Sequence, residues 1–418
     1  MRVLFLTQVI PWPPDAGAKV RAYYTIKHLS RHHEITLVSF VRHEEGPHAF
    51  AHLHTLCSSV HTVLMKRSWV SDWWYFGRSV TSRKPFLLMR DQRRAMERVI
   101  EGVVVRGGPF DVIHADQLYM APYALFARAL AGNRSRTILD QHNAVFRIPE
   151  RLAQTEASVL RRVVLRAEAR KLCRHEVTLC NSFDHVVWVT ALDCQALANH
   201  GLVGQESSRG AVIPIATEPP ELTSSKLASH TAESHRRRVT FLGGLHWPPN
   251  AEGVSWFIET VWPMVKKAVP DALLTIIGRR PSRPAKGDGG ASIEYAGHVD
   301  NLDPYLRSTA VFVVPLLSGG GMRVKILDAW GWALPVVSTS VGAEGLMFVD
   351  GHNGLLADTS ATFTSAVTKV LRDPVLAARL GAAGRRTVED HYDWRKTYAA
   401  WDEVYGCAFS SSFPTCPA

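Results

Sequence analysis

Three consecutive glycines interrupt the most regular stretch of this chain. Residues 311–317 form an apolar run, Gly319, Gly320 and Gly321 follow after one serine, and a second apolar run with helical spacing begins at once. Each glycine costs backbone entropy and offers no side chain for packing, so three in a row indicate a sharp turn or a backbone that lies against a ligand. Arg323 and Lys325 fall in the first turn of the predicted helix. A strand, a glycine loop, a helix N-terminus and two cations together predict an anion site, with phosphate as the expected anion.

The chain has 418 residues, which is too long for one ordinary hydrophobic core, so two domains are expected. Apolar strand patterns alternate with helical patterns twice along the sequence, once from Met1 and again from Val239. This alternation predicts an α/β protein with two facing Rossmann-like, doubly wound domains and a cleft between them. Strands are expected at Met1–Thr7, Glu34–Phe40, Thr62–Met65, Val112–His114, Thr137–Leu139, His185–Thr190, Ala211–Pro214, Val239–Gly243, Leu273–Ile277, Ile293–Tyr295, Val311–Pro315 and Pro335–Ser338, and helices at Val20–Leu29, Ala251–Val265, Ile326–Trp332, Ala361–Leu371 and Pro374–Val388.

The composition suggests where the domains meet. Residues 218–238 are rich in Pro, Ser, Thr and charge, which is typical of a linker. We therefore expect an N-terminal domain at 1–217, a linker at 218–238 and a second domain at 239–390. A C-terminal helix at 391–410 and a tail at 411–418 complete the prediction.

The net charge of +10 points to an anionic partner, which could be nucleic acid, phospholipid headgroups or a diphosphate substrate. The sequence shows no zinc-finger, basic-zipper or RNA-binding aromatic pattern, so nucleic acid is not expected. No window of 18 apolar residues occurs, so no membrane span is predicted. The six cysteines lack metal-ligand spacing, and we expect reduced thiols in a cytoplasmic protein without a metal site.

Glycines end several predicted strands of the second half. Gly243 and Gly244 follow the first strand, Arg279 lies just after the second, and Gly297, His298 and Val299 follow the third. A tight turn after the strand is one interpretation of each of these segments. Their repetition at one sheet edge favours a nucleotide site, because ligands of such sheets bind at the carboxyl ends of strands. The loop Pro11–Gly17 after the first strand of the chain fits an anion site or an ordinary connection equally well.

Polar side chains gather at the corresponding ends of two strands in the first half. His114 and Asp116 follow one strand, and Asp140, His142 and Asn143 follow the next. A single histidine in such a place is usually structural. Two polar clusters at one edge shift the interpretation towards function, and both clusters are expected to face the cleft.

An aromatic cluster and a basic helix remain to be explained. Trp69 and residues 73–76 lie close to Arg78, Arg83 and Lys84, and arginines recur with helical spacing at 161–174. These features suit a membrane interface or a lipid-bearing substrate. The alternative interpretation is an aromatic core beside a solvated helix.

The chain resembles a retaining GT-B glycosyltransferase of the family four type, the glycosyl transferases group 1. The resemblance covers nearly the whole sequence. It is carried by the opening Pro-x-Pro-Pro with Gly17 and Arg21, by Phe110–His114, by Phe241–Gly244 with Asn250, by Leu327–Ser338 and by Tyr392–Tyr405.

This resemblance implies a hexosyltransferase-type enzyme in surface polysaccharide or glycolipid biosynthesis. Such an enzyme takes a sugar from a UDP- or GDP-linked donor and passes it, with retention, to a glycan or lipid-linked acceptor. The N-terminal domain would hold the acceptor and the second domain the donor, and the last helix would cross back to the first domain. The protein would work in the cytoplasm or peripherally on the inner face of the cell membrane, and no metal cofactor would be required.

The resemblance also assigns roles to residues. Asp328 would meet the donor ribose, Gly297–Val299 the base, and Gly17 and Gly319–Gly321 the sugar and diphosphate. Gly243, Gly244 and Arg279 complete the implied donor site.

The chain departs from the family pattern in three places. The first of two usual glutamates falls at Gly320, and the second is Asp328. The usual cations after the first donor-domain strand are absent, so Arg323 and Lys325, with Arg279, are expected to neutralise the phosphates. Asp116 stands where the family usually has a histidine, and His142 is expected to take over the role of that histidine. A nucleotide-sugar epimerase or a non-catalytic nucleotide-sugar-binding subunit on the same scaffold remain alternatives.

Overall fold

The computed structural model describes residues 1–42, 47–66, 68–202, 210–222, 237–279, 292–299 and 301–407. The chain divides into two compact units. Unit 1 contains Met1–Ala216, Gly320–Met322 and the C-terminal segment from Thr397, and unit 2 contains Thr217–Gly319 and Arg323–Lys396. Most of the predicted linker, and the whole predicted tail, lie outside the described residues.

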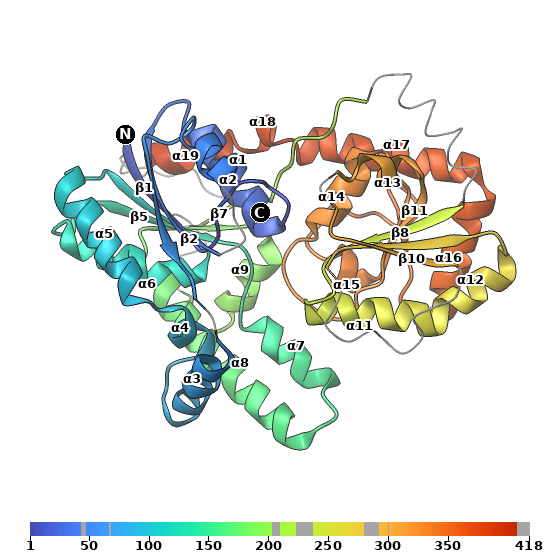
Figure 1. The fold of residues 1–418 in the computed structure, drawn as a ribbon, viewed down its shortest axis with the longest axis horizontal. Helices are drawn as coiled ribbons and strands as arrows, with labels where there is room; N and C mark the ends of the chain where they lie inside the picture. The colour runs from blue at the N-terminus through green and yellow to red at the C-terminus, as the bar shows by residue number, and fades with distance from the viewer. Residues whose placement is uncertain are drawn as a thin grey trace. The chain divides into compact units, whose positions relative to one another are not determined.

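Unit 1 is built on a parallel sheet of seven strands in the order β3-β2-β1-β4-β5-β6-β7. The order reverses between β1 and β4, which is the arrangement of a doubly wound fold. Helices surround the sheet (Figure 1). The strands are β1 (Arg2–Thr7), β2 (Glu34–Val41), β3 (Ser59–Leu64), β4 (Val112–Asp116), β5 (Arg136–Gln141), β6 (His185–Trp188) and β7 (Gly210–Val212), and the helices are α1 (Gly17–Leu29), α2 (Pro47–Leu53), α3 (Trp69–Thr81), α4 (Phe86–Asp91), α5 (Arg94–Gly107), η1 (Leu118–Met120), α6 (Ala121–Leu130), α7 (Arg147–Thr155), α8 (Val159–Asn181), α9 (Ala191–Ala198) and α19 (Ala400–Cys407).

Unit 2 repeats this plan with a parallel sheet of six strands in the order β10-β9-β8-β11-β12-β13. Its inner strands β8, β9, β11 and β12 are mostly apolar, as expected where both faces of a parallel sheet are covered. The strands are β8 (Arg238–Leu242), β9 (Leu273–Ile277), β10 (Ile293–Gly297), β11 (Thr309–Val314), β12 (Val336–Ser338) and β13 (Leu355–Leu356), and the helices are α11 (Pro248–Trp256), η3 (Phe257–Val261), α12 (Trp262–Ala268), α13 (Asp303–Arg307), α14 (Val324–Gly331), α15 (Ser340–Ala343), α16 (Ser360–Arg372), α17 (Pro374–His391) and α18 (Trp394–Thr397).

The predicted fold class is confirmed, because two parallel, doubly wound α/β sheets are present. The expected helix at Ala251–Val265 is longer and less regular than the pattern indicated. It begins at Pro248, passes through a π-helical turn at Phe257–Val261 and ends at Ala268. None of the described helices is long and apolar enough to cross a membrane.

A buried ion pair organises the core of unit 1. The Arg21 side chain is fully buried on α1, and its Nε and Nη2 each donate to an Asp140 carboxylate oxygen at 2.8 Å. Its Nη1 donates to the carbonyls of Ile213 and Pro214 at 2.7 and 2.9 Å. The guanidinium also faces the rings of Tyr398 and Trp401. One side chain therefore joins α1, β5, the segment after β7 and the C-terminal helical segment.

We predict that Arg21→Met destabilises unit 1 by about 3–5 kcal/mol, because it leaves the Asp140 carboxylate buried without its cation. Hydrogen exchange at the β5 amides measures the effect on this unit directly. Arg136→Met is the matched control, since Arg136 is 56% exposed and pairs with Asp184 at 3.7 Å. The control should cost less than about 1 kcal/mol. Equal effects of the two substitutions would contradict the organising role of Arg21.

Candidate active site

The carboxyl ends of β8, β9 and β10 are joined by backbone hydrogen bonds. Gly243 N–H donates to Ile277 at 2.8 Å, and Gly278 N–H donates to Gly297 at 2.7 Å. Leu245 N–H donates to the Arg279 carbonyl at 2.9 Å. These amides are occupied by neighbouring strands. The glycine-bearing strand ends do lie at one sheet edge, as expected, but these particular amides are not the anion donors.

Gly243 has a structural purpose that the sequence did not reveal, while its donor-binding role stays a prediction. A Cβ atom at this position would lie 2.6 Å from Lys325 Nζ and 2.8 Å from Asn250 Nδ2. The missing side chain therefore makes room for a cation of the same chain beside the end of β8. Gly297 differs again, because a Cβ there would meet none of the described residues while its φ of +73° favours glycine.

Lys325 projects from the second residue of α14 and is held from two directions. Its Nζ donates to Asn250 Oδ1 at 2.9 Å and lies 4.4 Å from the centre of the Phe241 ring. Asn250 in turn donates to the Gly244 carbonyl at 2.9 Å. The helix thus supplies, at the end of β8, the positive charge that the β8 loop itself lacks.

Arg323 stands at the N-cap of α14 and is almost completely buried. A Cβ at Gly319 would lie 3.0 Å from its Nη2, so the first glycine of the triplet gives the guanidinium its space. The first turn of α14 contains no acidic residue. Cations at a helix N-terminus oppose the helix dipole, so this arrangement is unfavourable by itself and favours a bound anion.

The pKa values of Lys325 and Asp328 on α14 are both shifted by their surroundings. Burial, helped by the charge of Arg323, lowers the pKa of Lys325 to about 7, whereas Asp328 opposes the shift. Burial raises the pKa of Asp328 to about 7, and Lys325 opposes that shift. Asp328 lies three residues after Lys325, on the same face of the helix. A bound anion would raise the pKa of Lys325 and favour its protonated state.

The other predicted donor residues of unit 2 lie at the same sheet edge. Arg279 follows β9 with an exposed side chain. His298 is exposed and Val299 is partly buried directly after β10. Gly320 and Gly321 group with unit 1, as does Gly17, which is the first residue of α1. Their donor-binding roles stay predictions.

The predicted acceptor-side residues come together in unit 1. Asp116 and Asp140 are register partners at the ends of β4 and β5. His142 Nε2 lies 2.8 Å from Asp116 Oδ1 and 3.8 Å from Asp140 Oδ2. His142 is the residue expected to substitute for the histidine that the family usually has at position 116. It is hydrogen-bonded to Asp116, the residue that occupies that position here.

The two carboxylates have different environments. Burial raises the pKa of Asp116, although His142 opposes the shift. Burial would also raise the pKa of Asp140, but the charge and hydrogen bonds of Arg21 outweigh it and leave this pKa below its usual value. The ligand atoms of Asp116, Asp140 and His142 lie within 4.8 Å of one another, as a metal site would require. Because Arg21 already binds both oxygens of Asp140, the cluster is an internally neutralised network rather than an open set of ligands.

His114 does not have the accessible position expected of it. It is fully buried, stacks on Phe5 with ring centres 4.2 Å apart, and its Nδ1 lies 2.9 Å from Tyr405 Oη. Burial lowers the pKa of His114 to about 3. The imidazole is therefore a neutral part of the core.

Two buried carboxylates hold the loop that carries His142, and the sequence did not reveal them. Glu176 on α8 accepts hydrogen bonds from Gln141 Nε2 and the Val145 N–H at 2.5 and 2.8 Å, and from Phe146 N–H at 3.1 Å. Asp193 on α9 accepts from Ala144 N–H at 2.9 Å. Both residues fall in helical patterns far from the loop, so only the fold brings them to it.

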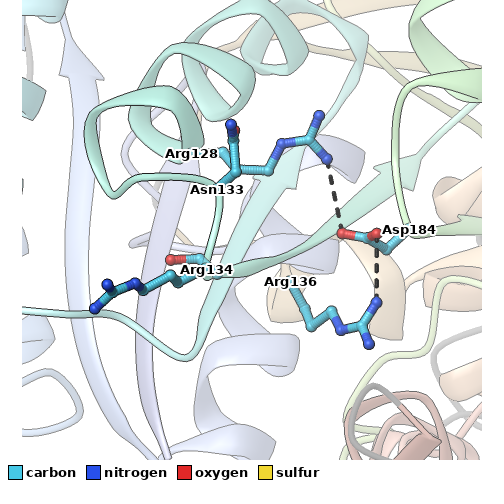
Figure 2. Close-up of a pocket in the computed structure, with 6 residues that line it drawn as sticks. Arg128, Asn133, Arg134, Arg136 and Asp184 are labelled. Carbon is cyan, nitrogen blue, oxygen red and sulfur yellow. Dashed lines mark ion pairs between the residues drawn. The ribbon is translucent and has the colours of Figure 1, made fainter. Parts of the chain in front are cut away.

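A hollow of about 440 Å³ lies at the opposite edge of the unit 1 sheet. Figure 2 shows Arg128 and Arg136 directed towards Asp184, which pairs with them at 3.8 and 3.7 Å. Asp184 also accepts from the Thr137 N–H at 2.8 Å. The hollow lies at the amino ends of β5 and β6, whereas ligands of parallel sheets bind at the carboxyl ends. It is therefore not the candidate active site.

Residues 236–373 match the family model described as glycosyl transferases group 1. This part of the chain, most of which lies in unit 2, is therefore similar to the glycosyltransferases of group 1. An uncharacterized 44.6 kDa protein in the cps region of Klebsiella pneumoniae is 22% identical over 96% of this chain and 98% of its own length. A phosphatidyl-myo-inositol mannosyltransferase of Mycobacterium leprae is 30% identical over 40% of this chain and 46% of its own length.

Solved structures agree on the architecture of this glycosyltransferase. Anabaena HepE, crystallised with UDP-glucose, superposes with a TM-score of 0.67 at 13% identity and covers 97% of this chain and 99% of its own. WaaG, a glycosyltransferase involved in lipopolysaccharide biosynthesis, gives a TM-score of 0.65 at 12% identity over 97% of this chain and all of its own. The fold is GT-B, as the sequence predicted.

We predict a pH dependence governed by Lys325. The ammonium is charged below its pKa and neutral above it, so kcat/KM for the donor should fall as pH rises through about 7. The corresponding fall in kcat should come at higher pH, because the bound diphosphate favours the charged form. Asp328→Asn should move the limb in kcat/KM to lower pH, because it removes a charge that raises the pKa of Lys325. A limb unmoved by Asp328→Asn would contradict this assignment.

We predict that Glu176→Ala lowers kcat by roughly tenfold or more by releasing the His142 loop, an amount equivalent to about 1.4 kcal/mol. Glu176→Gln should retain most activity at pH 7, because burial raises the pKa of Glu176 to about 8 and the native side chain is then mostly neutral. The native fold holds this proton while the unfolded chain releases it near its ordinary pKa, so the stability contribution falls as pH rises towards 8. Glu176→Gln should remove that fall, and a series of melting temperatures from pH 5 to 8 measures it. A merely structural role would leave kcat unchanged in both variants.

Proposed function

We propose that this glycosyltransferase moves a hexose from a UDP- or GDP-linked donor to a glycan or lipid-linked acceptor, with retention, in surface polysaccharide or glycolipid assembly. The observation that carries the proposal is Lys325, whose ammonium lies beside Gly243 at the end of β8. The relatives support the substrate classes, since one is named for phosphatidyl-myo-inositol and another was crystallised with UDP-glucose. We place the reaction in the cytoplasm, at the inner face of the cell membrane.

On the donor side, the chemistry follows from charge. Negative charge grows on the leaving diphosphate in the transition state, and fixed cations aimed at it lower the barrier. Arg323 and Lys325 supply these cations, with Arg279, which follows β9 at the same sheet edge. Asp328 receives the ribose hydroxyls, and Gly297–Val299 meet the base. In this proposal the phosphates are neutralised by side chains and no metal cofactor is required.

On the acceptor side, His142 and Asp116 form the reactive pair. The Asp116 carboxylate binds Nε2 of His142 at 2.8 Å, which fixes the orientation of the ring. The imidazole is partly accessible, whereas Asp116 and Asp140 are fully buried. His142 is therefore the group of this cluster that can meet an acceptor.

A second candidate function has one observation in its favour. Gly320 stands where the family usually has an acidic residue, and a carboxylate is thereby lost from the donor side. A non-catalytic nucleotide-sugar-binding subunit would tolerate this loss. An epimerase on the same scaffold would release a rearranged sugar without an acceptor.

The deciding experiment is a panel of UDP- and GDP-linked sugars, with nucleotide release followed with and without acceptor extracts. Transfer with nucleotide release supports the proposal, and the anomeric configuration of the product tests retention. Binding of donor without turnover would favour the non-catalytic subunit. A rearranged sugar formed without acceptor would favour the epimerase.

Lys325→Ala should lower turnover of the preferred donor by about 10²- to 10³-fold, the usual effect of losing one group that stabilises the developing charge. Lys267→Ala is the matched control, because Lys267 is an exposed lysine near the C-terminus of α12. It should retain full activity. Unchanged donor hydrolysis and transfer in Lys325→Ala would refute the assignment of Lys325 to the diphosphate.

A further inference from the structure

Helix α3 of unit 1 carries its most apolar side chains on its solvent face. Trp69, Trp73 and Trp74 are 75%, 64% and 58% exposed, and Val70 and Val80 beside them are exposed as well. The first four of these positions recur at spacings of three and four residues, and Val80 lies seven residues after Trp73, so all five form one stripe. An amphipathic helix on the surface of a globular protein usually turns its apolar stripe towards the core, but the described part of the chain leaves this stripe exposed.

The opposite face of α3 is the one that packs on the protein. Ser79 Oγ donates to Glu168 of α8 at 3.3 Å, and Lys171 Nζ donates to the Ser79 carbonyl at 2.5 Å. Phe76 contacts Phe86 edge to face. Trp73 contacts Phe76 in the same way but stays 64% exposed. Figure 1 shows α3 beside α8. Polar anchors thus fix the inner face, and the tryptophans remain outside.

Positive charge surrounds the exposed stripe. Lys66 precedes α3, Arg78 lies in its last turn, and Arg83 and Lys84 follow it, all of them exposed. Arg170 on α8 is exposed next to Lys171, which contacts α3. The single acidic residue of α3, Asp72, is partly buried. The exposed tryptophans of α3 are therefore flanked by basic side chains, which we call the basic frame.

This combination identifies the occupant by its chemistry. Tryptophan rings settle at the level of lipid headgroups, and basic side chains attract anionic lipids at the same depth. A 13-residue helix lying in the membrane plane with three tryptophans inserted meets the requirement for two signals, apolar insertion and charge. A second copy of this chain would bring the same positive frame against itself, which disfavours self-association through this face.

We propose that the α3 face, defined as Trp69, Val70, Trp73, Trp74 and Val80 with its basic frame, docks on an anionic phospholipid bilayer. The inference deepens the proposed function, on which it rests for its biological purpose, because docking would bring unit 1 to a lipid-linked acceptor. The binding itself needs no donor and no turnover.

The test is co-sedimentation of the full chain with vesicles of phosphatidylcholine alone and of phosphatidylcholine mixed with phosphatidylglycerol. The native protein should bind the mixed vesicles, bind the neutral ones weakly, and lose affinity in high salt. The triple variant Trp69→Ser, Trp73→Ser and Trp74→Ser should weaken partitioning by roughly tenfold or more, because apolar insertion is removed. Arg83→Glu with Lys84→Glu should abolish the preference for anionic vesicles.

Matched controls separate docking from general effects. Val105→Ser and Val375→Ser remove exposed apolar side chains elsewhere, at 71% and 77% exposure, and should bind vesicles like the native protein. Melting temperature and nucleotide release without vesicles should be unchanged in the triple variant, which shows that it is folded.

Two outcomes would overturn the inference. One is vesicle binding that the triple variant leaves unchanged. The other is a native dimer that the triple variant dissociates while vesicle binding stays absent, which would make the face an interface between copies. Failure of the proposed function would show differently, as the absence of nucleotide release in every variant while vesicle binding persists.

Discussion

The buried pair of Arg21 and Asp140 is the interaction on which unit 1 depends. A guanidinium without solvent contact is stable only when its donors are satisfied, and here four hydrogen bonds and two aromatic faces surround it. The consequence reaches the candidate active site. By neutralising Asp140, Arg21 leaves Asp116 as the carboxylate that engages His142, although the two carboxylates are register partners on neighbouring strands.

Unit 2 follows a different principle, in which absent side chains decide where charges lie. Glycine at 243 leaves room for Lys325, whose Nζ would lie only 2.6 Å from a Cβ there, and glycine at 319 eases the approach of Arg323, whose Nη2 would lie 3.0 Å from a Cβ. Burial, together with the charge of Arg323 at the start of α14, lowers the pKa of Lys325. A site that is electrostatically strained when empty binds an anion more strongly, because the ligand relieves the repulsion.

Local patterns in the sequence were enough to predict many of the strands and helices and the sheet edge at which glycines gather. The apolar runs of β1 and β11 and the helical spacing of α14 are properties of short segments, so they could be read without tertiary contacts. Parallel strands then place the glycines of β8, β9 and β10 at one edge by topology alone. The donor-binding role of those glycines stays a prediction, because a missing side chain does not reveal whether a ligand or a neighbouring lysine fills the space.

Contacts between distant residues were beyond the sequence for a physical reason. A hydrogen bond forms only if the donor–acceptor distance is right to within a few tenths of an ångström. Strand register and helix packing set this distance, whereas residue order does not. Asn250 accepts a hydrogen bond from Lys325, which lies 75 residues away in the sequence. Glu176 on α8 accepts one from the backbone of the loop that carries His142. Likewise, His114 has the same residue type and strand-end position as a catalytic group, yet stacking on Phe5 makes it part of the core.

The sequence by itself therefore determined the two doubly wound sheets, the family, and the sheet edges at which charge and glycine gather. These follow from periodicity and residue type, which act locally. Only the tertiary structure decided which cation lies beside β8, which histidine is accessible and which face of α3 is left uncovered. Those outcomes arise because burial and partner geometry are properties of the packed chain, in which residues far apart in sequence compete for the same space.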